Sequence, residues 1–219
     1  MKKSYSTFRL FTTALGCALM IAATSRADDF VHFKGRPGSK VRIDGSANIH
    51  DWHMDGNIIS GEFDVPANVT LDSSQAAVAG LSGDKLNAHA TVRIPVNSMQ
   101  SDVSSAMDAV MQDAMNAKDH PQIEYKLSEM TLKQPHAAGT PLQFDTKGDL
   151  TVNGVTKAIT MPVSIETVDK TKMKITGGPV PILMTDYQVQ PPTKAGIFTT
   201  HPDVKITFEW VVSLPKQAK

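Results

Sequence analysis

Two histidines and an aspartate stand together in the segment His50-Asp51-Trp52-His53, where they form a cluster of candidate metal ligands. Zinc accepts imidazole and carboxylate ligands, and Asp55 adds a further oxygen nearby. In a strand, residues three apart point to opposite faces, so the two histidines converge only if the chain turns there. A third ligand from a distant residue, for example His120 or His201, cannot be assigned by spacing, and both of these histidines precede proline, which favours a turn. A metal-dependent enzyme or metal carrier is therefore the alternative interpretation, and we assign no metal ligands.

Nucleophilic catalysis has even less support in the sequence. The chain has no Gly-x-Ser-x-Gly elbow. Its one cysteine, Cys17, lies in an N-terminal segment that we expect to be removed. Motifs that cradle phosphates or dinucleotides are also absent. We therefore predict a protein that is not an enzyme and that needs no cofactor.

The N-terminus has the organisation of an export signal. Basic residues begin the chain, an apolar stretch runs from 10 to 23, and Ser25-Arg26-Ala27 offers a small-x-small cleavage site. The stretch is short for a membrane span, which needs about 20 residues, although an uncleaved anchor is the alternative. We expect a signal peptide over residues 1–27, cleavage between Ala27 and Asp28, and a periplasmic or secreted bacterial protein. The mature chain is then expected to have no transmembrane segment.

Cleavage would also change the charge balance. The whole chain holds 22 basic and 22 acidic residues, and the expected signal contains basic residues but no acidic one. The mature chain is therefore mildly acidic, which does not favour nucleic acid as a partner. It also has no cysteine and must depend on its apolar core for stability. Residues 28–219 suffice for one all-β domain, which can run to about 200–250 residues.

The pair Asn153-Gly154 between two alternating apolar runs indicates a β-hairpin, because both positions of a tight turn favour positive φ. A two-residue turn fixes the register and gives one apolar and one mostly polar face. Lys157 is the only charge on the apolar face. The predicted pairs on that face are Val152 with Val155, Leu150 with Lys157, Gly148 with Ile159, Thr146 with Met161, Phe144 with Val163 and Leu142 with Ile165.

Alternating apolar residues predict further strands. These cover residues 41–49, 57–65 after a turn at Met54-Asp55-Gly56, 85–96, 123–127, two short pieces within 172–184 around Gly177-Gly178-Pro179, and 204–212. About eight strands bounded by turn signals are typical of an antiparallel barrel or sandwich.

One segment has a helical period instead. Met107, Val110, Met111, Ala114 and Met115 fall at the spacing of an amphipathic helix. Ser105 with Asp108 resembles a capping box. The helix must end before Pro121, because proline disfavours helical geometry at the preceding residue. We therefore predict one short α-helix.

Four blocks together resemble the YceI family of exported bacterial proteins, which have a lipid- or polyisoprenoid-binding-like domain. The resemblance covers roughly Phe30 to Leu214 and implies an all-β, antiparallel, lipocalin-like β-barrel of about eight strands whose interior holds a long apolar chain. The family has no assigned catalytic residues. The matching blocks are Ile49-His50-Asp51-Trp52 with Gly61-Glu62-Phe63, then 115–123, 148–157 and 186–192.

We expect this protein to bind and carry an isoprenoid or fatty-acyl ligand inside the barrel. An eight-stranded barrel can enclose one small ligand or be filled by side chains. Methionine side chains adapt to irregular apolar shapes, so the helix is a candidate wall or lid. The candidate ligand-binding residues are Phe144, Met161, Val163, Phe208 and Trp210 from strands, Met107, Met111 and Met115 from the helix, and Trp52 and Tyr187 as rim aromatics placed by the family motifs.

Lys157 is the candidate for an anionic headgroup, because it lies beside the predicted turn and hence near a barrel end. The alternative is that its stem is buried and its amine stays in water. A structural protein whose barrel is filled by the same apolar residues is a further alternative. Exposed barrel rims also allow a homodimer, although nothing in the sequence requires one.

Overall fold

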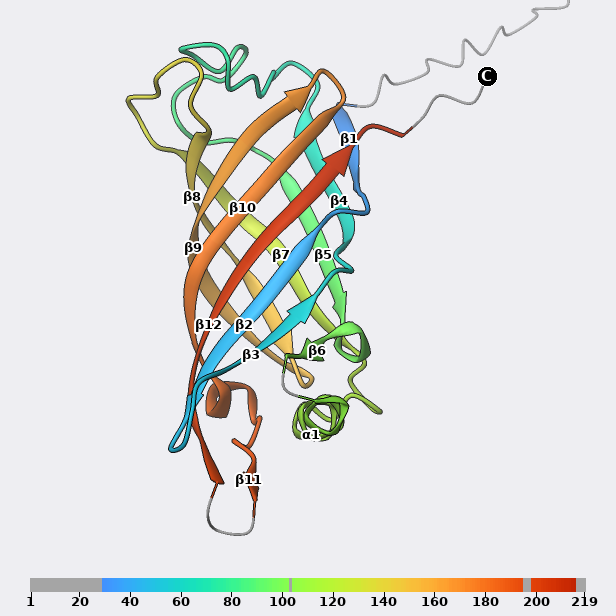
Figure 1. Ribbon diagram of the computed structural model, residues 1–219. Coiled ribbons are helices and arrows are strands. Elements are labelled where there is room, and N and C mark those ends of the chain that lie inside the picture. The colour runs from blue at the N-terminus through green and yellow to red at the C-terminus, as the bar shows by residue number, and fades with distance from the viewer. Residues whose placement is uncertain (1–28, 103, 195–197, 216–219) are drawn as a thin grey trace, which may run out of the picture.

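The computed structural model describes residues 29–102, 104–194 and 198–215, so the predicted signal peptide lies outside the described residues. This part of the chain forms a closed eight-stranded antiparallel β-barrel with a single α-helix, as predicted (Figure 1). The helix α1 (Ser105–Ala114) lies beside one end of the barrel. No helix within the described ranges is long and apolar enough to cross a bilayer. The longer strands are β7 (Gln122–Leu132), β8 (Leu142–Val152), β9 (Val155–Asp169), β10 (Lys172–Leu183) and β12 (Phe198–Ser213).

The first three positions around the barrel are each occupied by two short strands in line. β1 and β2 both run antiparallel to β12, with Gly35 opposite Val212 and Lys40 opposite Glu209. At the next position, β3 pairs with β2 and β4 pairs with β1. At the third position, β6 pairs with β3 and β5 pairs with β4. The breaks between these strands therefore lie beside one another on this side of the barrel. The short strands are β1 (Phe30–Gly35), β2 (Lys40–Ala47), β3 (Trp52–Gly56), β4 (Ser60–Pro66), β5 (His89–Pro95), β6 (Gln100–Ser101) and, at the far tip, β11 (Thr193–Lys194).

The β8–β9 hairpin has the predicted register at every predicted pair, from Val152 opposite Val155 to Leu142 opposite Ile165. Asn153 and Gly154 have φ values of 49° and 74°, the left-handed geometry that a tight hairpin turn requires. The Asn-Gly turn and the alternation of apolar residues therefore predicted the pairing of β8 with β9 correctly.

The prediction for the first hairpin was wrong. Residues Met54 to Gly56 are not a turn but belong to β3, which pairs directly with β2. The chain turns earlier, between Ala47 and Trp52, and breaks again between Gly56 and Ser60. The physical reason is packing, because Trp52 lies opposite Gly45 and Met54 opposite Ile43, on the interior face of the same ladder.

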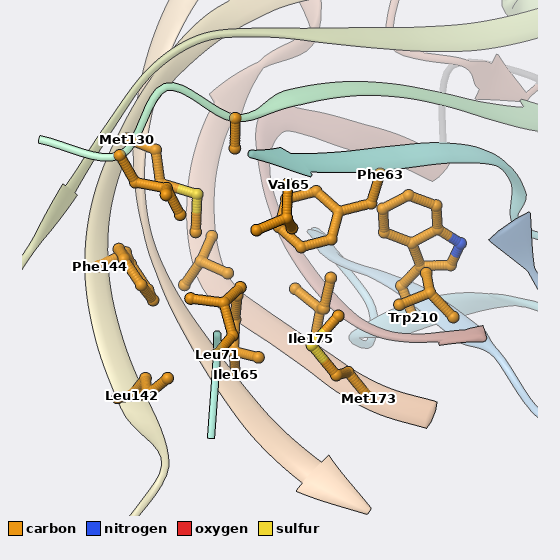
Figure 2. Close-up of a cluster of buried hydrophobic side chains, with 14 of the residues drawn as sticks. Phe63, Val65, Leu71, Met130, Leu142, Phe144, Ile165, Met173, Ile175 and Trp210 are labelled. Carbon is orange, nitrogen blue, oxygen red and sulfur yellow. The ribbon is translucent and has the colours of Figure 1, made fainter. Parts of the chain in front are cut away.

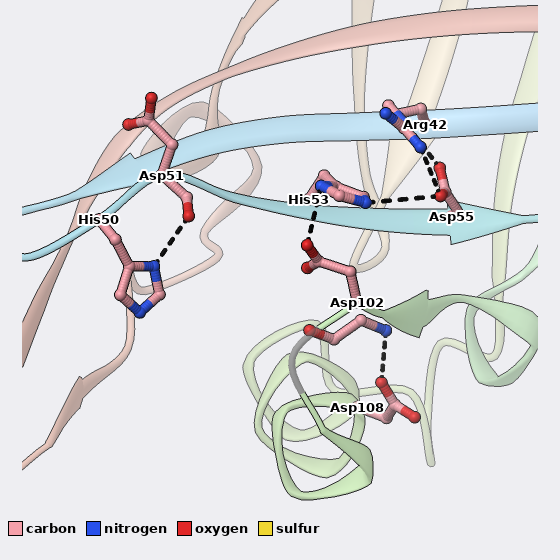
Figure 3. Close-up of polar contacts among 8 residues, drawn as sticks. Arg42, His50, Asp51, His53, Asp55, Asp102 and Asp108 are labelled. Atoms are coloured by element: carbon pink, nitrogen blue, oxygen red, sulfur yellow. Dashed lines mark hydrogen bonds and ion pairs between the residues drawn. The ribbon is translucent and has the colours of Figure 1, made fainter.

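Two smaller expectations also change. The segment 172–184 forms one strand, β10, with a bulge between Gly177 and Val180 rather than two separate pieces. The helix begins as predicted near Ser105. Its N-cap is Ser104, which makes no side-chain capping hydrogen bond, so the predicted capping box is wrong. Asp108 instead accepts a hydrogen bond from the backbone nitrogen of Ser101 at 2.6 Å, which fastens α1 to β6 (Figure 3).

The barrel is filled at the end opposite α1. Large apolar side chains from several strands meet there, among them Phe63, Leu142, Phe144 and Ile165 (Figure 2). The segment between β4 and β5 covers this end and contributes Leu71 and other buried side chains to the same cluster. Close packing of this kind supplies most of the stability of a fold without disulfides.

A pair of hydroxyl side chains fastens the covering segment to the wall. The backbone nitrogen of Ser73 donates to the Thr167 hydroxyl, and the backbone nitrogen of Thr167 donates to the Ser73 hydroxyl, both at 3.1 Å. The Thr167 hydroxyl in turn donates to the carbonyl oxygen of Leu71 at 2.9 Å. These bonds hold the covering segment over this end of the barrel.

Candidate ligand-binding site

The interior of the barrel near α1 is hollow. Three cavities follow one another along the axis, with volumes of about 100, 90 and 50 Å³. We call them the mouth, middle and deep chambers. The mouth and middle chambers share Ile43, Ile123, Ile182 and Ile206 as lining residues. The middle and deep chambers share Val92, Tyr125, Met161, Phe208 and Trp210, so the three chambers adjoin one another, and we call them together the lumen.

The lining of the lumen is uncharged and mostly apolar among the described residues. Its polar side-chain groups are threonine and tyrosine hydroxyls and the indole nitrogens of Trp52 and Trp210. The Thr146 hydroxyl donates to the carbonyl oxygen of Met161 at 2.9 Å, whereas the Tyr125 hydroxyl and Trp210 Nε1 are buried without a hydrogen-bond partner among the described residues. Burial raises the pKa of Tyr125 and of Tyr187, so both phenols stay neutral well beyond physiological pH. A charged group inside this lumen would lose its hydration without a partner, whereas an apolar chain would lose nothing.

The helix α1 covers the mouth chamber but does not fill it. Met107 and Met111 line the chamber together with Met115, which follows the helix. None of the ten helical residues is fully buried, and Val110 is 37% exposed. The apolar face of α1 therefore borders the chamber, while Met111 and Ala114 also pack against neighbouring buried side chains. Methionines at such a boundary can adjust to a guest.

The structure brings most of the sequence-predicted site residues to the lumen. Phe144 is the exception, since it is fully buried in the packed cluster of Figure 2 and lines none of the three chambers. The mouth chamber is lined by Trp52, Met107, Met111, Met115 and Tyr187, the middle and deep chambers by Met161, Phe208 and Trp210, and the deep chamber by Val163.

Several lining residues were missed from the sequence. Tyr125 borders both inner chambers, and Ile43, Ile182 and Ile206 line the passage between mouth and middle. The signal was present in the strand alternation, because Tyr125 stands between Ile123 and Leu127 on one face of β7. Alternation identifies the inward face of a strand, but not the depth at which the interior stops being filled.

Three of the family blocks meet at the rim near the mouth. The side-chain amide of Asn153 donates to the carbonyl oxygens of Tyr187 and Gln188. The His120 ring packs on Gly154, where an added Cβ would lie 2.6 Å from it. Lys157 is 43% exposed and forms an ion pair with Asp186 at 3.0 Å. This lysine therefore already has a carboxylate partner within the chain.

The histidines near β3 do not converge (Figure 3). His50 contacts the carbonyl oxygen of its neighbour Asp51 through Nδ1 at 2.8 Å. His53 faces Asp102 at 3.3 Å and Asp55 at 3.7 Å. Among the described residues, no three histidine, cysteine, aspartate or glutamate side chains are grouped so that they could hold a metal ion.

Arg42 on β2 binds Asp55 with two hydrogen bonds of 2.7 Å. This pairing holds the pKa of Asp55 below its usual range and raises that of Arg42. The cluster therefore links β2, β3 and the connection to α1 by surface ion pairs.

A closed eight-stranded antiparallel barrel with a helix at one end places the chain in the lipocalin-like class of folds. The family model described as the YceI-like domain matches residues 32–212. The chain therefore belongs to the YceI-like domain family, and the resemblance drawn from the sequence blocks is confirmed.

Two solved structures show the same fold at low sequence identity. Burkholderia cenocepacia BcnA is 20% identical, with a TM-score of 0.55 over 79% of this chain and 95% of that one. A polyisoprenoid binding domain from Saccharophagus degradans, implicated in plant cell wall breakdown, is 14% identical, with a TM-score of 0.59 over 85% of this chain and 99% of that one. No curated protein matches the chain significantly.

Proposed function

We propose that this protein binds and carries a long-chain hydrophobic ligand, a polyisoprenoid or another amphiphilic lipid, without transforming it. The observation that carries the proposal is the row of adjoining, uncharged chambers from the mouth to the deep chamber. Membership of the YceI-like family supports it, as does the likeness to a domain named for polyisoprenoid binding.

The affinity would come mainly from burial of the chain, at about 0.8 kcal/mol for each buried CH₂ group. The contacts are spread over many aliphatic and aromatic side chains, so no single one is indispensable. Truncating one lining residue is expected to weaken binding by about 1 kcal/mol rather than to abolish it. The methionines of α1 would adjust to the guest at the mouth.

A polar headgroup would remain at the mouth, since the lumen itself offers no charge. We propose Lys157 as a contact for an anionic headgroup, which would have to compete with Asp186 for the ammonium group. An exposed ion pair of this kind contributes little stability, so exchanging partners would cost little.

We also propose that residues 1–27 are a cleaved signal peptide and that residues 28–219 act in the periplasm or outside the cell. A lipid carrier between two membranes would need no cofactor and no nucleic acid partner. A homodimer through the barrel rims is a further proposal, to be checked by sedimentation.

Native mass spectrometry of protein purified from the periplasm without detergent tests the proposal, followed by solvent extraction of the adduct. A stoichiometric prenyl or acyl chain is the expected result. A bare mass that stays unchanged after incubation with prenols and fatty acids would reject the carrier function. A mass excess equal to that of a metal ion would instead support the metal-binding alternative, with His50 and His53 as candidate ligands.

A further inference from the structure

Large aromatic rings line the lumen, and three of them lie over a glycine of a neighbouring strand. One is Tyr125, which lies 2.4 Å from the position of an added Cβ on Gly148. For the other two, the glycine is the direct partner in the ladder. Trp52 on β3 faces Gly45 on β2, and Phe208 on β12 faces Gly177 on β10. A Cβ on Gly45 would lie 2.2 Å from the Trp52 ring, and one on Gly177 would lie 2.4 Å from the Phe208 ring. Each ring therefore occupies the space of the missing side chain.

The two pairs stand at different depths. Trp52 lines the mouth chamber, whereas Phe208 lines both the middle and the deep chambers. A ring displaced from its glycine cannot move outward, because the strand lies behind it. It must turn into the free space of the lumen, which at Phe208 is the passage to the deep chamber.

We propose that Gly45 and Gly177 set the bore of the lumen at these two depths, and that Gly177 determines how long a chain the protein accepts. The inference rests on the proposed function, since it concerns the same lumen. A methyl group at Gly177 would push the Phe208 ring into the passage and close the deep chamber. A methyl group at Gly45 would narrow the mouth, which every chain must cross.

The length of chain at stake follows from the strand geometry. The deep chamber extends along β9 from Met161 to Ile165. Four residues at about 3.3 Å each, tilted by about 40°, span about 10 Å of the barrel axis. Carbon–carbon bonds of about 1.5 Å in a zigzag give about eight carbons over this distance.

Binding of a homologous series of primary alcohols, from octanol to eicosanol, tests the proposal by calorimetry or native mass spectrometry. For the unaltered protein, affinity should rise about fourfold with each methylene until the lumen is full. Gly177→Ala should bind the short alcohols normally and reach its plateau about eight carbons earlier. Gly45→Ala should instead weaken all members of the series by a similar factor.

The double variant Gly177→Ala/Phe208→Ala separates the ring from a general loss of stability, since it should regain the long alcohols. Gly139→Ala is the matched control: its φ of 80° strains the backbone, but no described atom lies within 4 Å of the added Cβ. This control should keep the original length profile.

An unchanged plateau in folded Gly177→Ala, or no recovery in the double variant, would overturn the assignment of Gly177. If Gly177→Ala does not fold, Gly45→Ala still tests whether a glycine sets the width of the lumen. Unchanged affinities of Gly45→Ala for the alcohols would reject the proposal. Failure of the unaltered protein to bind any alcohol would reject the proposed function itself, which is a distinct result.

Discussion

The side-chain nitrogen of Asn153 lies 3.2 Å from the carbonyl oxygen of Tyr187, to which it donates a hydrogen bond. This bond joins the β8–β9 turn to the short helical turn η2 (Met184–Tyr187), which borders the mouth chamber. Two sequence blocks that are far apart in the chain therefore meet at the opening of the lumen. Asn153 has two roles there, because it also adopts the positive φ of the turn.

Comparison of Asn153→Ala with Asn153→Gly should separate these two roles. Alanine loses the hydrogen bonds and is strained at positive φ, so we expect a loss of about 2–3 kcal/mol in the free energy of unfolding. Glycine accepts the same φ and loses only the hydrogen bonds, so its cost should be about 1 kcal/mol. Urea denaturation of both variants measures the difference. Equal losses would mean that the turn geometry is unimportant.

Phe144 and Met161 should differ in what their truncation costs. Phe144 is packed on all sides, and its replacement by alanine should lower the free energy of unfolding by about 3–5 kcal/mol. Met161 borders the empty lumen, so Met161→Ala removes fewer contacts and should cost about 1–2 kcal/mol. Denaturant titration checks the order. A larger loss for Met161 would show that the lumen is collapsed in solution.

The difference between Phe144 and Met161 could be predicted from the sequence only in part. The Asn-Gly turn gave the register of β8 and β9, and alternation placed Phe144 and Val163 on the inward face. Those two residues are direct partners, yet Phe144 lies in the packed cluster while Val163 also lines the deep chamber. Whether an inward residue faces a neighbour or an opening depends on side chains from every other strand.

The first hairpin shows a second limit. The polar and glycine residues at Met54-Asp55-Gly56 have the composition of a turn, but tertiary packing places them in β3. The glycine leaves room there for two buried side chains, since an added Cβ would lie 2.5 Å from the Met99 sulfur and 2.9 Å from Val41 Cγ1. The same residue type therefore marks a turn in one place and a close contact in another.

Tryptophan fluorescence should report directly on the lumen. The chain has two tryptophans, and both line it, Trp52 at the mouth and Trp210 in the two inner chambers. In the variant Trp52→Phe, the emission of Trp210 should be quenched by a brominated alkyl chain and little affected by aqueous iodide, because Trp210 is 3% exposed. Trp210→Phe, which keeps Trp52, should respond more strongly to iodide. Strong iodide quenching of Trp210 would contradict a closed inner lumen.

The Arg42–Asp55 pair should give an acid-sensitive contribution to stability. Its hydrogen bonds lower the pKa of Asp55 from the ordinary 3.8, so the folded state holds the proton less tightly than the unfolded chain. The stabilisation is therefore present above pH 3.8 and is lost as the pH falls through the lowered value. Asp55→Asn should be slightly less stable than the original protein at neutral pH and equal to it in acid. A difference that persists in strong acid would assign the effect to packing.

The two tyrosines of the expected mature chain should titrate abnormally. Burial raises the pKa of both Tyr125 and Tyr187 above the ordinary 10.0, so the folded state retains their protons more tightly. Stability should therefore decrease as the pH rises above 10.0. Tyrosinate absorbance should appear together with loss of circular dichroism, whereas the urea-unfolded chain should titrate near 10.0. The variant Tyr125→Phe should resist alkali better, and unchanged sensitivity would assign the effect to Tyr187.

The broken strands on one side of the wall divide the barrel into two regions with separate requirements. Beyond the breaks, the covered end holds the packed cluster of Figure 2. Toward α1, the lining residues border empty space on one side, so truncating one of them removes fewer contacts. Under the proposed function, substitutions in this region would change the preferred guest at a smaller cost in stability than substitutions in the packed cluster.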